Sequence, residues 1–449
     1  MLSLSYFRSL VLLGFLAYAQ AAVQFLGVAM AGGDFGCDID GSCPLSTATL
    51  PLTELGHADG GGQMKHFVED DGVNVFRLPT SWQFLINNDK EVSDTFDPTN
   101  AGRYDQFMKA CLATGAYCMI DVHNFARFNG GIVGQGGPSD DMFVAIWAAL
   151  AKMYADEPKV VFEITNEPHD LDLKTWAATC QKVVNGIRNA GAKTQMILLP
   201  GTNFDSAATL ISTGSADALL AITNPDGSTD GLYLDIHKYL DNNNSGQNGE
   251  CTTNNIGNFT MLATYLRQKK RQGLISETGA SSEPSCMTDF CAQNAFINEN
   301  DDVYIGYVSW AAGQFDETYV LSLTPTLQPD GSYKDNTLFS ECVLAPYQKA
   351  GGAKGKALPS NTAAQPSSAS KTTQTKASTS SKPSATAATS PSSSNSDTGS
   401  DAGAKGGSLA ATTTTSASTS ASTNAASVGR AVHVVKNLAV AAVVGAALL

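Results

Sequence analysis

The chain reads Val161-Phe162-Glu163-Ile164-Thr165-Asn166-Glu167-Pro168 and, further on, Gly273-Leu274-Ile275-Ser276-Glu277-Thr278. Each segment is an apolar run of the strand type that ends on a carboxylate, Glu167 in the first and Glu277 in the second. Hydrolysis of a glycosidic bond needs two carboxyl groups close together, and two neighbouring strands can bring them to the same end of a sheet. The interpretation therefore depends on whether the rest of the chain brings these two strand ends together.

Further apolar runs of strand length precede, separate and follow these two segments. The eight runs are Val23–Ala29, Val73–Leu78, Ala116–Val122, Val160–Thr165, Gln195–Leu199, Gly231–Ile236, Gly273–Ser276 and Val303–Ser309. Amphipathic stretches of helical period lie between them, at 104–112, 142–154, 176–187 and 261–271. Short apolar runs that alternate with helices indicate parallel strands in βαβ units. Eight such runs predict an α/β fold, the (β/α)8 TIM barrel.

In a TIM barrel the chemistry lies at the C-terminal ends of the strands. Polar and aromatic residues should therefore gather just after the apolar runs, and the sequence has this pattern. The residues in question are Arg77, Trp82, His123, Asn124, Asn166, Glu167, His237, Tyr239, Glu277 and Trp310.

The two ends of the chain have compositions unlike the middle. Residues 1–21 have a basic start, a short apolar run and small residues at a cleavage position, which predicts a secretory signal peptide. Residues 351–426 are a Ser/Thr/Ala-rich stalk, predicted to be disordered because they cannot bury a core. Residues 427–449 resemble a glycosylphosphatidylinositol (GPI) anchor signal, which is removed when the anchor is attached. Residues 22–350 remain for one catalytic domain.

The charge balance is strongly acidic outside the tail. The tail from Gly351 holds 8 of the 28 basic and 2 of the 42 acidic residues, so residues 1–350 hold 20 and 40. We expect no nucleic-acid partner, because phosphate binding needs a basic patch. The sequence also has no metal-binding motif and no phosphate loop, so no cofactor is expected. We expect a monomer, with N-glycosylation at the sequons of Asn243 and Asn258.

Nine cysteines in a secreted chain predict disulfide bonds and one leftover thiol. Cys37 with Cys43, and Cys111 with Cys118, are close enough in sequence to close local loops. Cys180 lies within a helical pattern and is predicted to be the free, buried thiol. Three pairings remain open among the other four, which are Cys251, Cys286, Cys291 and Cys342.

The strand-end residues, in their order along the chain, resemble the pattern of glycoside hydrolase family 5. The segment Asn166-Glu167-Pro168 is similar to the family signature, and the resemblance extends over nearly all of residues 22–345. It is closest to the secreted fungal endo-β-1,4-glucanases. The resemblance implies that Glu167 is the acid/base, protonated when it meets the leaving oxygen, and that Glu277 is the ionised nucleophile. A retaining enzyme of this kind holds its two carboxyl groups about 5–5.5 Å apart.

Supporting roles follow for other strand-end residues. Asn166 is expected to hydrogen-bond the sugar 2-OH, Tyr239 to donate to the nucleophile, and Arg77 to pair with Glu277 and lower its pKa. His123, Asn124 and His237 are expected to line the site. Glu163 lies inside its strand and is expected to be a buried, paired structural acid.

Four aromatic residues are candidates for stacking against sugar rings. Trp82 and Trp310 follow strands, so each is expected to present a flat face to a pyranose ring. The related cellulases tend to have tryptophan in the loops where this chain has Phe128 and Phe204. Phenylalanine is a smaller platform, which predicts weaker binding at outer subsites.

The first hypothesis is thus a retaining endo-β-1,4-glucanase acting on cellulose chains, oligosaccharides or mixed-linkage β-glucan outside the cell. The alternatives within the enzyme class are an endo-β-mannanase and a cell-wall transglycosylase of the same fold. A non-catalytic, anchored wall-binding protein is the alternative from another class. That last alternative predicts the loss of a carboxylate, whereas Glu167 and Glu277 are both present.

Overall fold

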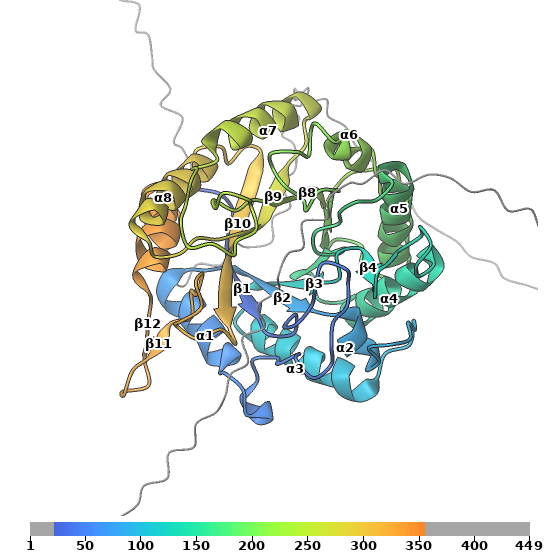
Figure 1. Ribbon diagram of the computed structural model, residues 1–449, viewed down its shortest axis with the longest axis horizontal. Coiled ribbons are helices and arrows are strands. Elements are labelled where there is room, and N and C mark those ends of the chain that lie inside the picture. Colours follow the sequence, from blue (N-terminus) through green and yellow to red (C-terminus); the bar gives the residue numbers. More distant parts are fainter. Residues whose placement is uncertain (1–21, 355–449) are drawn as a thin grey trace, which may run out of the picture. The chain divides into compact units, whose positions relative to one another are not determined.

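The computed structural model describes residues 22–354, and its eight long strands close into one barrel (Figure 1). In order around the barrel the strands are β1 (Phe25–Ala31), β10 (Tyr304–Gly313), β9 (Gly273–Thr278), β8 (Leu232–His237), β7 (Met196–Leu199), β6 (Val160–Glu163), β3 (Tyr117–Val122) and β2 (Val75–Thr80). Every neighbouring pair is parallel. The predicted TIM barrel is confirmed, and each of the eight predicted runs overlaps one barrel strand.

The helices form the outer ring of the barrel (Figure 1). They are α1 (Gly60–His66), α2 (Trp82–Ile86), α3 (Pro98–Ala113), α4 (Asp140–Met153), α5 (Leu173–Asn189), α6 (Ser215–Leu220), α7 (Ile256–Lys269), α8 (Pro284–Asn298) and α9 (Ala345–Lys349). Three further helical segments are the 3-10 helix η1 (Thr53–Leu55) and the π-helices η2 (Phe67–Asp71), which continues α1, and η3 (Phe339–Leu344), which leads into α9. Two small hairpins pair β4 (Arg127–Phe128) with β5 (Gly131–Ile132), and β11 (Thr326–Leu327) with β12 (Tyr333–Lys334).

Local sequence explains where the long helices begin. The carboxylate of Asp97 accepts from the first backbone N–H groups of α3, and Pro98 supplies a suitable first helical residue. Ser139 caps α4 and Asp172 caps α5 in the same way. These caps lie before the amphipathic stretches, so α3, α4 and α5 begin earlier than hydrophobic periodicity alone predicts.

Two apolar clusters make up the core. The larger one lies between the strands and the helices, where outward-facing strand residues such as Phe76 and Phe162 meet Phe107 of α3 and Trp147 of α4. The smaller one contains residues of opposite strand parity, such as Met119, which face the barrel interior. Burial on both faces explains why the strands read as nearly continuous apolar runs.

Four disulfide bonds join parts of the described chain, and all are compatible with the predicted set. They are Cys37–Cys43, Cys111–Cys118, Cys251–Cys286 and Cys291–Cys342. The last two select one of the three pairings that the sequence left open. Cys180 is free and buried, as predicted.

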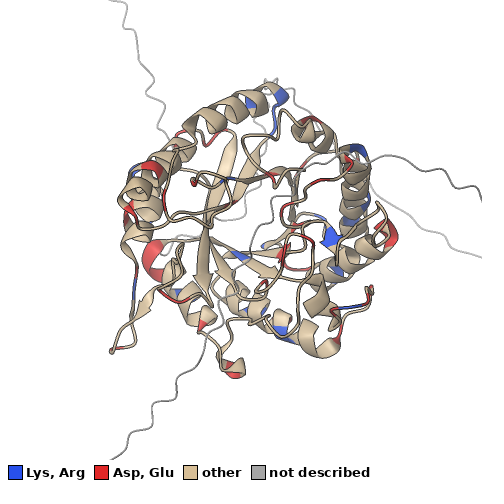
Figure 2. Cartoon of the chain, in the orientation of Figure 1, with Lys and Arg blue, Asp and Glu red and all other residues tan. Residues whose placement is uncertain are grey.

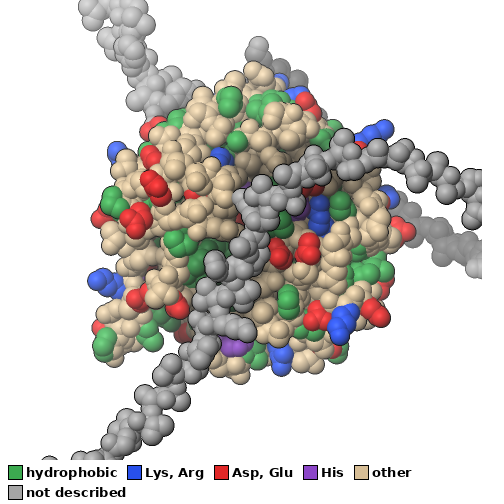
Figure 3. Space-filling view, in the orientation of Figure 1, with side chains coloured by type: hydrophobic (Ala, Val, Ile, Leu, Met, Phe, Trp, Pro, Cys, Tyr) green, Lys and Arg blue, Asp and Glu red, His purple; other side chains and the backbone are tan. Residues whose placement is uncertain are grey.

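The surface carries more acidic than basic side chains, as the composition indicates (Figure 2). On the part of the face that is visible in Figure 3, basic side chains lie singly and form no extended patch. The predicted signal peptide, the anchor signal and the stalk beyond residue 354 lie outside the described residues, so those predictions stay untested. Within residues 22–354, no helix combines the length and apolarity needed to cross a membrane.

Candidate active site

Glu167 and Glu277 meet beside His237. Glu277 lies near the end of β9, Glu167 lies in the loop after β6, and His237 ends β8. One carboxylate oxygen of each glutamate and one ring nitrogen of His237 all lie within 4.8 Å of one another. The Nδ1 atom of His237 is 3.0 Å from Glu167 Oε1 and 4.0 Å from Glu277 Oε1. The two carboxylates that the sequence singled out therefore share one site.

Glu277 is surrounded by groups that favour its ionised form. The Tyr239 hydroxyl donates to Oε1 at 2.7 Å, and Arg77 forms an ion pair with Oε2. Burial alone would raise the pKa of Glu277, but the positive charges of Arg77, His237 and His123 and the Tyr239 hydrogen bond outweigh burial and lower the pKa to about 2. The expected contacts of Tyr239 and Arg77 with Glu277 are thus present.

Arg77, on β2, is the fully buried cation at the centre of this arrangement. Its Nε donates to Glu163 at 2.7 Å, its Nη2 donates to Asn166 Oδ1 at 2.7 Å, and Nη2 also lies 3.0 Å from Asp121. Glu163 is buried and paired, as predicted. Because Arg77 contacts Glu277 as well, a single guanidinium joins side chains from β2, β3, β9 and the end of β6.

Glu167 has a different setting from Glu277. Its side chain is 18% exposed against 7% for Glu277, and its backbone φ of 43° lies in the left-handed region that few residues adopt. The Glu167 N–H donates to Asp205 Oδ2 at 3.1 Å, which helps to hold this conformation. Strained backbone of this kind is common at functional sites.

Asp205 is a site residue that the sequence analysis missed. It is fully buried, its Oδ1 accepts from Gly201 N–H, and its backbone carbonyl accepts from His237 N–H at 2.9 Å. Burial raises the pKa of its carboxyl. Asp205 thereby connects the backbones of Glu167 and His237. Its place shortly after β7 is the same strand-end signal that identified the other residues.

His237 is the charged bridge between the two glutamates. Burial lowers its pKa, but the charge of Glu277 and the hydrogen bond to Glu167 outweigh burial and raise the pKa to about 10. Protonated His237 donates its Nδ1–H to Glu167 Oε1. This bond fixes the direction in which the Glu167 carboxyl group points.

His123 and Trp310 form a flat wall next to these groups. Their rings stack at 5.8 Å with an interplanar angle of 24°, and His123 Nδ1 is 2.7 Å from Asp121. The Trp310 indole N–H donates to the Tyr319 hydroxyl at 3.1 Å, and Tyr319 stacks on Phe315 at 3.6 Å. Tyr319 and Phe315 were not predicted, because they lie in an irregular segment beyond β10.

Three of the residues predicted to bind substrate or support the site are buried in the structure. Trp82 is completely buried, because it starts the capped helix α2 and packs against Phe128 and Phe143. Phe128 is only 6% exposed, because the β4–β5 hairpin turns its ring onto Trp82. Asn124 is 1% exposed; its Oδ1 accepts from Trp82 N–H and its Nδ2 donates to Gln83. These residues support the loop and do not face the site.

Phe204 is the other phenylalanine predicted at an outer subsite, and its position differs from that of Phe128. It is partly exposed and stacks face to face on His169, with ring centroids 4.6 Å apart. His169 follows Glu167 by two residues in the same loop. Phe204 therefore remains a candidate platform for a sugar ring.

Three groups of histidine and carboxylate atoms in residues 22–354 are compact enough to hold a metal ion. Glu167 with His237 and Glu277 is the site described above, and Glu163 with Asp235 and His237 shares His237 with it. The third group consists of His66, Asp71 and Asp335 and lies on other elements.

A TIM barrel that carries two neighbouring carboxyl groups in unlike surroundings, one of them held ionised, has the equipment of a glycoside hydrolase. The family model described as cellulase (glycosyl hydrolase family 5) matches residues 42–313, and the chain belongs to that family.

Individual relatives are similar over most of the described region. The chain is 52% identical over 329 residues to endoglucanase EG-II of Hypocrea jecorina, covering 72% of this chain and 78% of that protein. It is 44% identical over 318 residues to endoglucanase 1 of Saitozyma flava, covering 71% and 88%. The crystal structure of Cel5A (EG2) from Hypocrea jecorina is 51% identical with a TM-score of 0.70, covering 72% of this chain and 99% of that one.

Proposed function

We propose that the chain is a retaining endo-β-1,4-glucanase that hydrolyses internal bonds of a β-glucan polysaccharide. The observation that carries the proposal is the approach of Glu167 and Glu277 oxygens to within 4.8 Å. Retaining glycosidases hold their carboxyl groups about 5–5.5 Å apart, whereas inverting enzymes leave about 6.5–9.5 Å for a water molecule. The endoglucanase names of the relatives support the β-1,4-glucan as the substrate.

Glu277 is the nucleophile in the first step. It attacks the anomeric carbon as the bond to the leaving oxygen breaks, and a covalent glycosyl–enzyme forms. Its low pKa supports this role, since only the ionised carboxylate can attack. The Tyr239 hydroxyl and Arg77 hold the two Glu277 oxygens from different sides, which fixes the attacking direction.

Glu167 is the general acid and then the general base. It protonates the leaving oxygen in the first step and takes a proton from the attacking water in the second. Its greater exposure suits a group that must exchange protons with water twice in each cycle. The hydrogen bond from His237 orients the carboxyl group, and the hydrogen bond from the Glu167 backbone N–H to Asp205 holds the backbone that carries it.

Neighbouring side chains bind the sugar. Asn166 uses its Oδ1 to accept from Arg77, which directs its amide NH2 toward the sugar 2-OH. Trp310 is only 8% exposed, but its indole is held by Tyr319 and stacked with His123 beside the two glutamates, so its exposed part is a rigid contact for a pyranose ring. Phe204, stacked on His169 in the loop that carries Glu167, is a second candidate platform.

The place of action follows from the ends of the chain. We infer that residues 1–21 direct secretion and that the anchor signal at 427–449 attaches the enzyme to the cell surface by a GPI lipid. Asn243 is exposed and Asn258 is partly exposed, so both are accessible for glycosylation. The enzyme acts as a monomer. Release of the protein from intact cells by a phosphatidylinositol-specific phospholipase tests the anchor.

Reducing-end release by the full secreted chain tests the activity. The panel is barley β-glucan, carboxymethyl cellulose, glucomannan and laminarin, with Glu277→Gln as the inactive variant. We expect rapid cleavage of the first two, loss in the variant, and a β-anomer as the first product by proton NMR. Preference for glucomannan would favour a mannanase. Transfer products formed without hydrolysis would favour a transglycosylase. An α-anomer as the first product would refute retention.

A further inference from the structure

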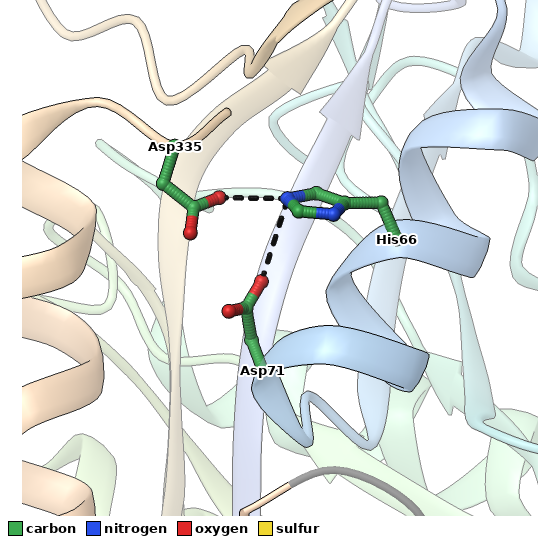
Figure 4. A group of neighbouring side chains, drawn as sticks. All are labelled: His66, Asp71 and Asp335. Atoms are coloured by element: carbon green, nitrogen blue, oxygen red, sulfur yellow. Dashed lines mark hydrogen bonds and ion pairs between the residues drawn. The ribbon is translucent and has the colours of Figure 1, made fainter. Parts of the chain in front are cut away.

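The third group of ligand atoms lies far along the chain from Glu167 and Glu277. His66 ends α1, Asp71 ends η2, and Asp335 follows β12, so the group joins the start of the barrel to the segment that closes it. Figure 4 shows both carboxyl groups turned toward the same ring nitrogen of His66. His66 Nε2 is 2.9 Å from Asp335 Oδ1 and 3.6 Å from Asp71 Oδ2. All three ligand atoms lie within 4.8 Å of one another.

Asp71 supplies a buried oxygen that is short of a partner. The residue is only 5% exposed, and its Oδ2 accepts no hydrogen bond within the described part of the chain. The 3.6 Å distance to His66 is too long for a hydrogen bond. A buried carboxylate oxygen without a donor is costly, and a cation placed between Asp71, His66 and Asp335 would remove that cost.

Asp70 completes the arrangement from the other side of the ring. Its Oδ2 lies 2.7 Å from His66 Nδ1. Histidine ligands of metal ions usually donate their second ring N–H to a carboxylate, which fixes the tautomer and leaves the other nitrogen free to bind metal. With Nδ1–H donated to Asp70, release of the Nε2 proton leaves a lone pair directed at Asp71 and Asp335.

The local charge also favours a cation. Among the ion pairs of residues 22–354, His66 is the only positively charged partner of Asp70, Asp71 and Asp335. When a metal ion replaces the Nε2 proton of His66, that ion becomes the cationic partner of these carboxylates. Asp335 also lines an open cavity of about 490 Å³ together with Lys334 and Asn336, so this ligand lies beside space that solvent can enter.

We propose that His66, Asp71 and Asp335 bind one divalent transition-metal ion, Zn²⁺ or Mn²⁺, at a site separate from the active site. One imidazole nitrogen and two carboxylate oxygens suit these ions, and water would fill the remaining coordination positions. The ion replaces the proton on His66 Nε2. It ties the segment after β12 to α1 and η2, so its effect is on stability rather than on the chemical step.

The test uses the full secreted chain without an affinity tag, stripped with EDTA and titrated by calorimetry with ZnCl2, MnCl2 or CaCl2. We expect one Zn²⁺ per chain, tighter than Mn²⁺ as the general order of metal affinities requires, and no comparable Ca²⁺ binding. At a free metal concentration of about 100 times Kd, the melting temperature should rise by roughly 4 °C.

Variants assign the ion to these residues. Asp335→Asn and Asp71→Asn should weaken Zn²⁺ binding by at least about 30-fold and abolish the thermal shift, since each removes a ligand. Glu69→Gln is the matched control, because Glu69 is an exposed acid on the same turn, and it should bind like the wild type. Hydrolysis of barley β-glucan by each variant verifies that the variant folds. If Asp71→Asn does not fold, because Asp71 is buried, the binding measured for Asp335→Asn tests the proposal alone.

Two results would overturn the proposal. One is a wild-type chain that binds no Zn²⁺ or Mn²⁺ at millimolar concentration, in which case His66 is simply an imidazolium held between Asp70 and Asp335. The other is binding that survives Asp335→Asn. If that binding disappears in Glu277→Gln, the ion belongs to the active site.

Discussion

Replacing Tyr239 with phenylalanine isolates one contact of the proposed nucleophile. The Tyr239 hydroxyl donates to Glu277 Oε1 at 2.7 Å, and the change removes only that oxygen while the buried ring stays. A hydrogen bond to a charged group contributes about 1.5–3 kcal/mol. At 1.36 kcal/mol per pKa unit, its loss should raise the pKa of Glu277 by about 1–2 units, from a wild-type value of about 2.

The assay is kcat/KM against pH on barley β-glucan, which carries no titrating groups of its own. The acid limb of the profile should move upward by about 1–2 pH units in Tyr239→Phe. At the pH optimum kcat should fall by up to about 100-fold, because the nucleophile loses one of the groups that position it. Circular dichroism at each pH separates titration from unfolding.

Tyr319→Phe is the matched control for this experiment. Tyr319 is partly buried near the site, but its hydroxyl accepts from Trp310 and forms no hydrogen bond with Glu277. Its acid limb should stay near that of the wild type. An acid limb that coincides in Tyr239→Phe and wild type would refute the reasoning that this hydroxyl holds Glu277 ionised.

Further predictions concern stability and thiol chemistry. Arg77→Lys leaves buried carboxylates incompletely paired and should cost about 3–5 kcal/mol, seen as a melting temperature about 5 °C lower. The pKa of Glu277 is depressed from 4.5 to about 2, so its ionised form stabilises the fold fully above pH 4.5. This stabilisation is lost as the pH falls from 4.5 toward 2. Over that interval the melting temperature of the wild type should fall relative to that of Glu277→Gln. Cys180 should resist a thiol reagent in the native state and react as one thiol per chain in denaturant. Because the Cys291–Cys342 bond spans 51 residues, replacing both cysteines with serine should destabilise the chain by about 4 kcal/mol.

The barrel could be predicted because its signal is repeated. Each strand is buried on both faces, so it leaves an apolar run that needs no knowledge of its neighbours. The strand-end rule then brought Glu167, His237 and Glu277 together without any measured distance. Register within a strand was also enough to separate Glu163, which points inward from β6, from Glu167 in the loop beyond it.

The errors arose where a loop folds back on the barrel. Trp82 follows β2 as a substrate-binding aromatic would, but Ser81 caps a short helix that turns the indole into the core. Nothing near Trp82 in the sequence shows that Phe128, 46 residues later, will cover it. Asp205 was missed because its partners are the backbone N–H groups of Glu167 and Gly201, which only the folded loops bring near it.

The proposed metal site shows the same limit. The spacing of His66, Asp70 and Asp71 places them on one turn of helix, which is a visible signal at short range. Asp335 comes from a hairpin at the other end of the domain, and its approach depends on the closing of the barrel. A search for metal motifs along the sequence cannot find a site whose third ligand is more than 260 residues away.

The different roles proposed for the two glutamates follow from where each stands relative to its strand. Glu277 is part of β9, so the sheet fixes its backbone and directs its side chain into the centre, where Arg77 and His237 keep it charged. Glu167 stands beyond the end of β6, where the φ of 43° turns the side chain toward the opening and leaves it more exposed. A carboxylate inside the strand gains a fixed position and a low pKa, which a nucleophile needs. A carboxylate outside it gains access to water, which an acid/base needs.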